Sequence, residues 1–288
     1  MRAKTYCNNL IRSLKERKDI TINKYKIYYK NKSFDFLRIS SRNISKKDKI
    51  IFISSGIHGD ETAGPMSILK YANEMIDYAH SNNIKIIIYP LMNPSGFEFG
   101  LRYNIDNNSG EEGNNDFLRY ELENGRLLGD IKKGIKFKKW HWSSDVCISL
   151  PKETILIQKL LKKEMLENFT ASIDLHQDKI TRTFKVAAYH YSFGKLKIYR
   201  KIIMNINSLI DIYKNKKIDA GFSLNKSAML SDNLGFIVRH DASISDLFFR
   251  LGVKHCVTVE TTGVTPLNTA CNVNLIWIRG IIDLISSN

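Results

Sequence analysis

The sequence has few cysteines, and they form no pattern that could build a structural framework. The 288 residues include four cysteines, Cys7, Cys147, Cys256 and Cys271, and no two of them form a CxxC pair. Close pairs are typical of structural zinc sites, and dense cysteines are typical of small disulfide-stapled domains. The wide spacing here favours four reduced thiols.

Long apolar runs are also missing. A membrane-spanning helix needs about 20 consecutive, mostly apolar residues, and no segment of the sequence approaches this. The start of the chain carries positive charge but lacks the apolar core of a secretory signal peptide. We therefore expect no membrane partner and a cytoplasmic location.

Acidic residues are scarce relative to basic ones. Asp and Glu together number 29 against 44 Lys and Arg, which gives a net charge of +15. Clustered basic residues bind nucleic acid by releasing counterions from phosphates. In this sequence the basic residues are spread over the whole length without an arginine cluster or a known nucleic-acid motif. A composition bias, or attraction of an anionic substrate, explains the charge better than a nucleic-acid partner does.

The remaining composition is that of an ordinary globular protein, with 43% apolar and 25% charged residues. From residue 49 onward, apolar runs alternate with helical periods, which is typical of a mostly parallel sheet covered by helices. We therefore expect a single α/β domain with a mixed, mostly parallel β-sheet flanked by helices. The expected strands are 49–54, 84–89, 170–175, 183–190 and 255–260, and the expected helices are 63–80, 152–167, 196–213, 242–251 and 267–286.

The first part of the chain has a different pattern. Leu10, Ile11 and Leu14 lie at helical spacing and predict an amphipathic surface helix over 8–18. The runs 25–30 and 34–39 predict a hairpin at a sheet edge. Within the single domain, these features set an N-terminal helical extension, 1–24, apart from the core, 25–288. The segment 93–150 is the least regular, and long structured loops of this kind usually build active sites.

Two strand ends carry residues that suit a metal. His58 and Glu61 stand three apart in SSGIHGDETAG, directly after a buried strand, and His176 ends the strand in TASIDLHQD. The carboxyl ends of parallel strands are where ligand sites form in such sheets. Two His and one Glu are a set that holds catalytic zinc and leaves a fourth position for water. This predicts one Zn²⁺ per chain, although a lone H-x-x-E also occurs by chance and such histidines can be hydrogen-bonded core residues.

A third strand end supplies a further acid. Glu260 finishes the apolar run in HCVTVETTG, and an acid there is costly to bury without a task or a partner. Zinc lowers the pKa of bound water from 15.7 to about 7, and a nearby carboxylate can take up the proton. Glu260 fits that catalytic role, with a strand-end salt bridge as the alternative. Asp174 or Asp178 could orient a liganding imidazole, although Asp178 could equally be a solvated loop acid.

These residues resemble the zinc carboxypeptidases. The order H-x-x-E, His, Glu is theirs, with gaps of 176 − 61 = 115 and 260 − 176 = 84 residues, and the match spans about 49–286. LMNPSGFEFGLRYN resembles the family's Asn-Pro-x-Gly stretch followed by an arginine. The resemblance implies that Arg102 polarises the scissile carbonyl. NNDFLRY resembles the family's Asp-x-Asn-Arg segment, which implies that Arg119 grips the substrate's terminal carboxylate.

The sequence also departs from the family pattern. Leu118 stands where the family has Asn beside the arginine, so Asn115 or Asn114 would have to supply the amide contact. The family's mobile tyrosine is missing, because no Tyr follows Tyr213, and His240 or Phe236 occupies that region. Asp246 stands near the position of a specificity residue in the family. If it points inward, the resemblance implies a preference for substrates with an amine near the cleaved bond; the alternative is that it faces solvent.

The resemblance implies a zinc-dependent metallocarboxypeptidase that hydrolyses an amide bond next to a free carboxylate. The alternative is a zinc-dependent deacylase of small N-acyl amino acids, similar to the succinylglutamate desuccinylase and aspartoacylase branch. Members of that branch typically add a β-rich region after the catalytic acid, whereas the 288 − 260 = 28 residues here predict one helix. A binding protein on an inactive scaffold is a third possibility, which the complete ligand set disfavours. The expected partner is a peptide or N-acyl amino acid that bears a carboxylate.

Overall fold

The structure is a computed structural model. It describes residues 1–105, 118–129, 131, 135–142, 150–164, 166–179, 185–218, 229–240 and 242–287. The helices are α1 (Ala3–Leu14), α2 (Ala63–Ser81), α3 (Pro94–Phe99), α4 (Lys152–Leu161), α5 (Arg200–Asn207), α6 (Ile244–Arg250) and α7 (Leu267–Ser286). The strands are β1 (Ile20–Tyr29), β2 (Lys32–Ser41), β3 (Lys49–Ser55), β4 (Ile84–Tyr89), β5 (Leu118–Glu121), β6 (Leu127–Leu128), β7 (Lys139–Trp142), β8 (Ala171–Leu175), β9 (Ala187–Ser192), β10 (Asp211–Ile212), β11 (Lys217–Ile218), β12 (Met229–Leu230), β13 (Phe236–Ile237) and β14 (His255–Thr261).

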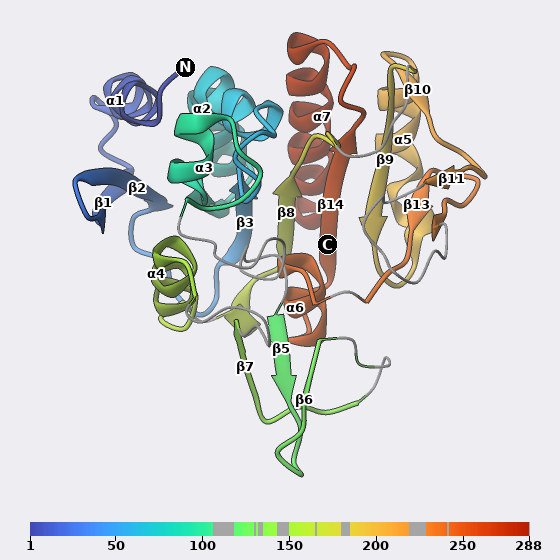
Figure 1. Ribbon diagram of the computed structural model, residues 1–288. Coiled ribbons are helices and arrows are strands. Elements are labelled where there is room, and N and C mark those ends of the chain that lie inside the picture. The colour runs from blue at the N-terminus through green and yellow to red at the C-terminus, as the bar shows by residue number, and fades with distance from the viewer. Residues whose placement is uncertain are drawn as a thin grey trace.

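The centre of the molecule is a nine-stranded mixed sheet (Figure 1). Its strand order is β1-β2-β4-β3-β8-β14-β9-β10, with β13 added beside β9. The four central strands β4, β3, β8 and β14 are parallel, whereas β2 runs antiparallel to β4 on one side of them and β9 runs antiparallel to β14 on the other. The predicted α/β fold with a mostly parallel sheet is confirmed. Because β3, β8 and β14 are parallel neighbours, their carboxyl ends meet at one edge of the sheet.

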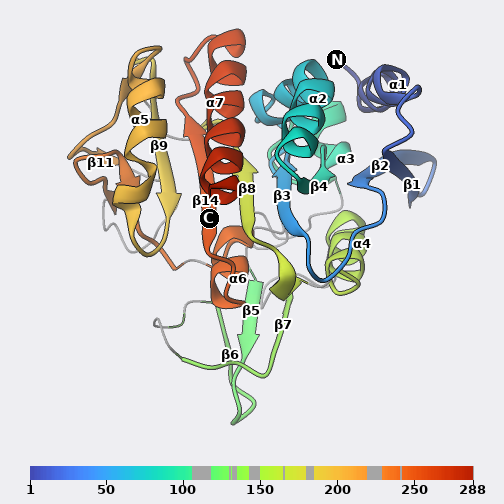
Figure 2. The same ribbon diagram turned by 180° about the vertical axis from the view of Figure 1, so that it is seen from behind.

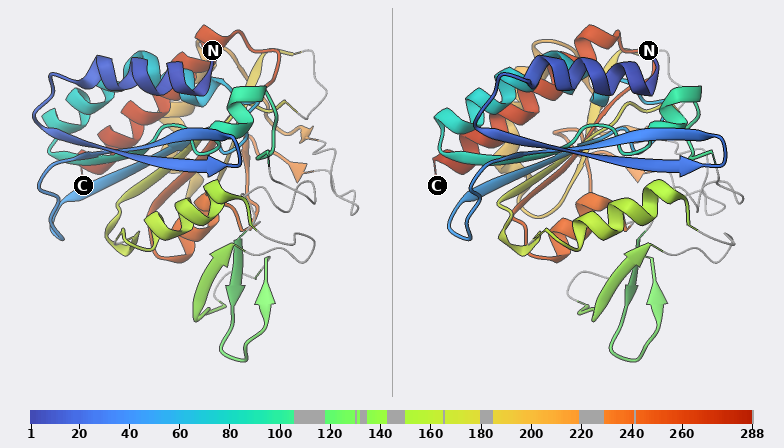
Figure 3. Two further views of the ribbon diagram at one scale, coloured as in Figure 1. Left: turned by 60° about the vertical axis from the view of Figure 1, so that its left-hand side comes forward. Right: turned by 90° about the vertical axis from the view of Figure 1, so that its left-hand side faces the viewer.

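Helices cover both faces of the sheet (Figure 3). Alternate residues of β3 point to opposite sides, so Ile51 and Ile53 lie on the face covered by α1, α2, α5 and α7, and Ile50 and Phe52 lie on the face covered by α4 and α6. The view from behind shows α2 and α7 side by side over the central strands (Figure 2). Within the described residues, no helix is both long and apolar enough to cross a membrane.

The N-terminal helix differs from the expected surface helix. It begins at Ala3 and ends at Leu14, and it buries Tyr6, Leu10 and Leu14 in the main core. The Tyr6 hydroxyl donates a hydrogen bond to the carbonyl of Pro65 at 3.0 Å. The apolar positions therefore continue one turn further toward the N-terminus than the prediction placed them. The strand that follows starts at Ile20, before the expected boundary at residue 25.

Three other predictions need correction. The helix expected over 196–213 is a 3₁₀ turn, Leu196–Tyr199, followed by α5, which ends at Asn207 and gives way to the short strand β10. The helix expected over 152–167 ends at Leu161. The described part of 93–150, expected to be loop-rich, contains α3 and a three-stranded antiparallel sheet of order β6-β5-β7, which projects at the lower end of the molecule in Figure 1.

Candidate active site

The turn after β3 delivers two of the predicted metal ligands. Strand β3 ends at Ser55, and Gly56 takes a φ of +65°, a backbone conformation in which glycine is the least strained residue. The chain then turns through His58 and Glu61 before α2 begins at Ala63. His176 follows the end of β8, the strand beside β3. The adjacent strand ends therefore carry the two histidines and the glutamate to one place.

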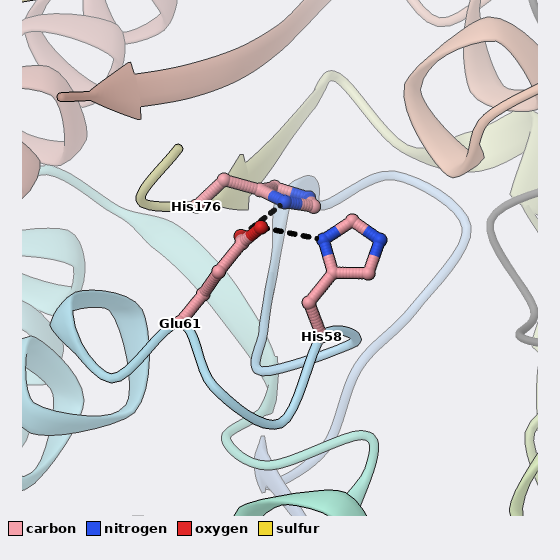
Figure 4. A group of neighbouring side chains, drawn as sticks. All are labelled: His58, Glu61 and His176. Carbon is pink, nitrogen blue, oxygen red and sulfur yellow. Dashed lines mark hydrogen bonds and ion pairs between the residues drawn. The ribbon is translucent and has the colours of Figure 1, made fainter. Parts of the chain in front are cut away.

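The carboxylate of Glu61 lies between the two imidazoles (Figure 4). Its Oε1 is 2.8 Å from Nδ1 of His58, and its Oε2 is 2.8 Å from Nδ1 of His176. All three side chains are buried, and one donor atom of each lies within 4.8 Å of the others. The residues fit zinc, because a catalytic zinc site takes three such ligands from His, His and Glu. His58, Glu61 and His176 would hold the ion.

A second layer of contacts fixes His176 and Glu61. Nε2 of His176 lies 3.0 Å from Oδ2 of Asp174, and the hydroxyl of Ser54 donates to the other Asp174 oxygen at 2.7 Å. The backbone amide of Gln177 donates to Glu61 Oε2 at 3.2 Å. Metal-binding histidines usually have such a carboxylate on the nitrogen that does not bind the metal, because it fixes the ring orientation. Asp174 therefore makes the contact that its spacing predicted.

The charges of the cluster support each other. Burial alone would raise the pKa of Glu61, but His58 and His176 outweigh it and hold the pKa well below the ordinary value. Burial alone would lower the pKa of His176, but Asp174 and Glu61 reverse that effect and raise it well above the usual range. Glu61 is therefore ionised, as a ligand carboxylate must be, and the imidazoles around it balance its charge.

Glu260 lies beside the ligands. It is in β14, and its Oε1 is 3.8 Å from Nδ1 of His176. Its Oε2 is buried without a hydrogen-bond partner among the described residues. Burial, more than any neighbour, raises the pKa of Glu260 well above its ordinary value. A carboxylate that is buried and incompletely paired is suited to accept a proton.

Arg102 reaches the same cluster from the loop after α3. Its Nη1 donates a hydrogen bond to Glu61 Oε1 at 2.7 Å, and about a fifth of its side chain remains exposed. The structure therefore brings together five of the predicted site residues: His58, Glu61, His176, Glu260 and Arg102. The fixed cation at the rim of the cluster could bind an oxygen on which negative charge develops.

Two of the predicted substrate-binding residues, Arg119 and Asp246, make contacts outside the metal-ligand cluster. Arg119 lies in β5 opposite His141 of β7, and its guanidinium packs on Gly129, where an added Cβ would be 2.9 Å from Nη1. Asn115 lies outside the described residues. The role of each in binding the substrate stays a prediction.

Asp246 does not face solvent. It is fully buried in α6; its Oδ1 lies 2.7 Å from Nδ1 of His240, and its Oδ2 accepts hydrogen bonds at 2.8 Å from Tyr120 and Arg250. The carboxylate therefore joins α6 to β5 and to the segment after β13. Its contact with an amine-bearing substrate stays a prediction.

The structure also adds Tyr189, a residue that the sequence did not single out. Tyr189 of β9 is the cross-strand partner of Glu260, and its hydroxyl donates to Asp178 Oδ2 at 2.7 Å. Asn93 holds the loop that carries Arg102. Tyr189 could not be found from the sequence, because its place depends on the register of an antiparallel pair, whereas the Asn-Pro dipeptide at 93–94 was visible as a family landmark.

A comparison with protein families identifies the family of this chain. The family model described as zinc carboxypeptidase matches residues 7–180, so the chain belongs to the zinc carboxypeptidase family. A comparison with curated proteins found no match to the sequence.

Solved structures share the fold. A candidate metallopeptidase from Shewanella baltica OS155 is 18% identical, with a TM-score of 0.69 over 98% of this chain and 91% of that one. One from Shewanella amazonensis SB2B is 17% identical, with a TM-score of 0.65 over 98% and 91%. Thrombin activatable fibrinolysis inhibitor is 14% identical, with a TM-score of 0.61 over 100% and 74%.

Proposed function

We propose that this chain is a zinc-dependent metallocarboxypeptidase that hydrolyses an amide bond next to a free carboxylate. The observation that carries the proposal is the buried His58–Glu61–His176 set with Glu260 beside it. Zinc bound by such a set, at one ion per chain, lowers the pKa of a coordinated water molecule to about 7 and polarises a carbonyl.

The chain's own residues have separate roles in this proposal. Glu260 accepts a proton on its carboxylate and returns it to the leaving amine, which its raised pKa favours. Arg102 donates to the oxygen of the scissile carbonyl as negative charge develops there. Arg119 pairs with the terminal carboxylate of the substrate, since a guanidinium matches a carboxylate with two parallel hydrogen bonds. Asn115 supplies an amide contact to the same carboxylate.

Asp246 would influence the choice of substrate through the groups that it holds. Because its oxygens already accept bonds from Tyr120, His240 and Arg250, an amine on the substrate would have to replace one of these partners. If that happens, peptides that end in Lys should be cleaved faster than peptides that end in Leu. Equal rates would remove Asp246 from the proposed substrate site.

One observation supports the deacylase alternative. Leu118, which replaces the family's Asn, is the first residue of β5; its side chain is fully buried in the core and offers no polar contact to a carboxylate. The carboxylate pocket is therefore weaker than the family pattern implies, and a small N-acyl amino acid could be the substrate instead.

The experiment that separates these functions uses one cleavable peptide in two forms. The zinc-loaded chain is assayed on the free acid, on the C-terminal amide, and on a panel of N-acyl amino acids, with Glu260→Gln as the blank. A charge-assisted contact contributes roughly 1.5–3 kcal/mol, so amidation should lower kcat/KM about ten- to a hundredfold. Arg119→Met should abolish most of that difference. Equal kcat/KM on the free acid and the amide, or activity on N-acyl amino acids alone, would refute the proposed carboxypeptidase function.

A further inference from the structure

Asn93 is a fully buried side chain whose amide joins several parts of the active-site loop. It stands before α3, and its Oδ1 accepts hydrogen bonds from the amide of Gly96 at 2.8 Å and from Nδ2 of Asn104 at 3.0 Å. Its Nδ2 donates to the carbonyl of Arg102 at 3.1 Å. One buried amide thereby caps α3 and at the same time holds the residue that carries the site's guanidinium.

The carbonyl of Arg102 has a second partner in the metal-ligand turn. The amide of Gly59, the residue after His58, donates to it at 3.1 Å. The Arg102 backbone is therefore held between Asn93 on one side and the 58–61 turn on the other. Through its side chain, Arg102 donates a hydrogen bond to the candidate ligand Glu61. Arg102 and the ligand turn are joined twice, once through the backbone and once through the side chain.

Glycines allow this close approach. A Cβ atom at Gly59 would lie 2.2 Å from the carbonyl carbon of Gly96 and 2.5 Å from the carbonyl oxygen of Leu101. A Cβ atom at Gly96 would lie 2.5 Å from the side-chain nitrogen of Asn93. Backbone therefore packs directly on backbone here. A displacement of Asn93 would therefore also displace the backbone segments that contact it.

The loop is also supported from behind. Ser95 donates its hydroxyl to Asn93 Oδ1 at 3.3 Å, and its backbone amide donates to Glu153 Oε1 at 3.3 Å. Glu153 is buried in α4 and also accepts a hydrogen bond from the hydroxyl of Tyr29 in β1. Asn93 is thus fixed on the far side by two elements that belong to the body of the fold.

We propose that Asn93 is the positioning residue of this site: its amide holds the Arg102 backbone against Gly59, so that the guanidinium and the metal-ligand turn keep one fixed relation. This inference rests on the proposed role of Arg102. A displacement of about 1 Å in a catalytic group can lower turnover about a hundredfold. The contribution of Asn93 should therefore appear in kcat, and it should depend on the presence of Arg102.

The test compares Asn93→Ser with Asn104→Ala. Serine is a good residue at a helix N-cap, so the variant keeps the bond to Gly96 but is too short to reach the Arg102 carbonyl. Asn104→Ala removes a bond to the same amide and leaves that carbonyl untouched. Both variants are made in the wild-type chain and in Arg102→Ala, and kcat, KM, zinc content and Tm are measured for each.

We expect Asn93→Ser to lower kcat about ten- to a hundredfold in the wild-type chain, with KM and zinc content nearly unchanged. In the Arg102→Ala background it should lower kcat less than about threefold, because residues that act through one another are not additive. Asn104→Ala should stay within about threefold of wild type. Equal losses from Asn93→Ser in both backgrounds, or equal losses from Asn93→Ser and Asn104→Ala, would overturn the inference.

A second measurement does not depend on activity. Hydrogen exchange of the Gly59 amide, followed by NMR in the metal-free protein, should be faster in Asn93→Ser than in wild type and unchanged in Asn104→Ala. Unchanged exchange at Gly59 in Asn93→Ser would overturn the inference whatever the enzyme does. If exchange responds as expected but Arg102→Ala does not impair hydrolysis, the proposed role of Arg102 has failed and the positioning contact has not.

Discussion

Glu153 should make the protein less stable as the pH rises from 5 to 8. Its side chain is fully buried between α4 and the body of the sheet, with the Tyr29 hydroxyl and the Ser95 amide as hydrogen-bond donors. Burial raises the pKa of Glu153 to about 8, against an ordinary value of 4.5. The folded chain therefore holds this proton at neutral pH, whereas the unfolded chain has lost it.

The size of the effect follows from that difference. Because the folded-state pKa lies above the unfolded-state pKa, the contribution of protonated Glu153 is fully present below pH 4.5 and is lost as the pH rises toward 8. One pKa unit corresponds to 1.36 kcal/mol. From 4.5 to 7 is 2.5 units, so the free energy of unfolding should be about 3 kcal/mol lower at pH 7 than at low pH from this group alone.

The perturbation is Glu153→Gln, which has nearly the same shape, keeps an acceptor for Ser95 and cannot ionise. Denaturant unfolding is followed by tryptophan fluorescence, for which the buried Trp277 is a suitable reporter. The difference in free energy of unfolding between the variant and wild type should be constant below about pH 4, and it should then grow in favour of the variant up to pH 8. Taking the difference between the two proteins cancels the titration of all other groups. If the free energies of unfolding of the two proteins differ by the same amount at every pH, Glu153 is not held protonated in the folded chain.

Three further predictions concern single residues. His176→Ala should lose the zinc, and elemental analysis that finds undiminished zinc would show that the ligand set is wrong. Glu260→Gln should keep zinc and fold but lose roughly 10²–10⁴ in turnover, and near-normal turnover would remove Glu260 from the mechanism. The pKa of Asp35 is lowered because Lys24 and Lys26 outweigh its burial, so the stability advantage of wild type over Asp35→Asn should disappear as the pH falls; a constant difference would contradict this.

Some elements could be predicted almost to the residue. The helix α7 has the bounds 267–286 that its periodicity gave, because Pro266 fixes its start and apolar residues recur along its whole length. The strand β4 also begins and ends where the apolar run 84–89 does. The expected helix 196–213 failed because its apolar residues continue past Asn207. Ile210 and Ile212 are buried in the same core as α5, but they reach it from a turn and a short strand.

The site likewise contains residues that could be predicted from the sequence and residues that could not. His58, Glu61 and His176 were accessible to sequence reasoning because each follows a recognisable buried strand. Tyr189 was not, since it is brought to Glu260 by an antiparallel pairing whose register is not written in either segment. The contacts of Asn93 depend on which backbone groups its amide meets after the loop has folded.

The residues proposed for the chemistry and the residue proposed for substrate recognition belong to different parts of the fold. The candidate metal ligands and Glu260 follow or end the central parallel strands β3, β8 and β14, which are paired on both sides and buried by helices on both faces. Arg119 belongs to the small β6-β5-β7 sheet. Its middle strand, β5, is joined to the main body by the hydrogen bond from the Leu118 amide to the Ala242 carbonyl at 2.8 Å and by the hydrogen bond between Tyr120 and Asp246. Changes in that sheet can therefore alter the recognition of the substrate while the strands that hold the metal ligands keep their pairing. The proposed hydrolytic chemistry thus rests on the central strands, and the proposed specificity rests on Arg119 in a small sheet whose buried residues Leu118 and Tyr120 share a core with β3.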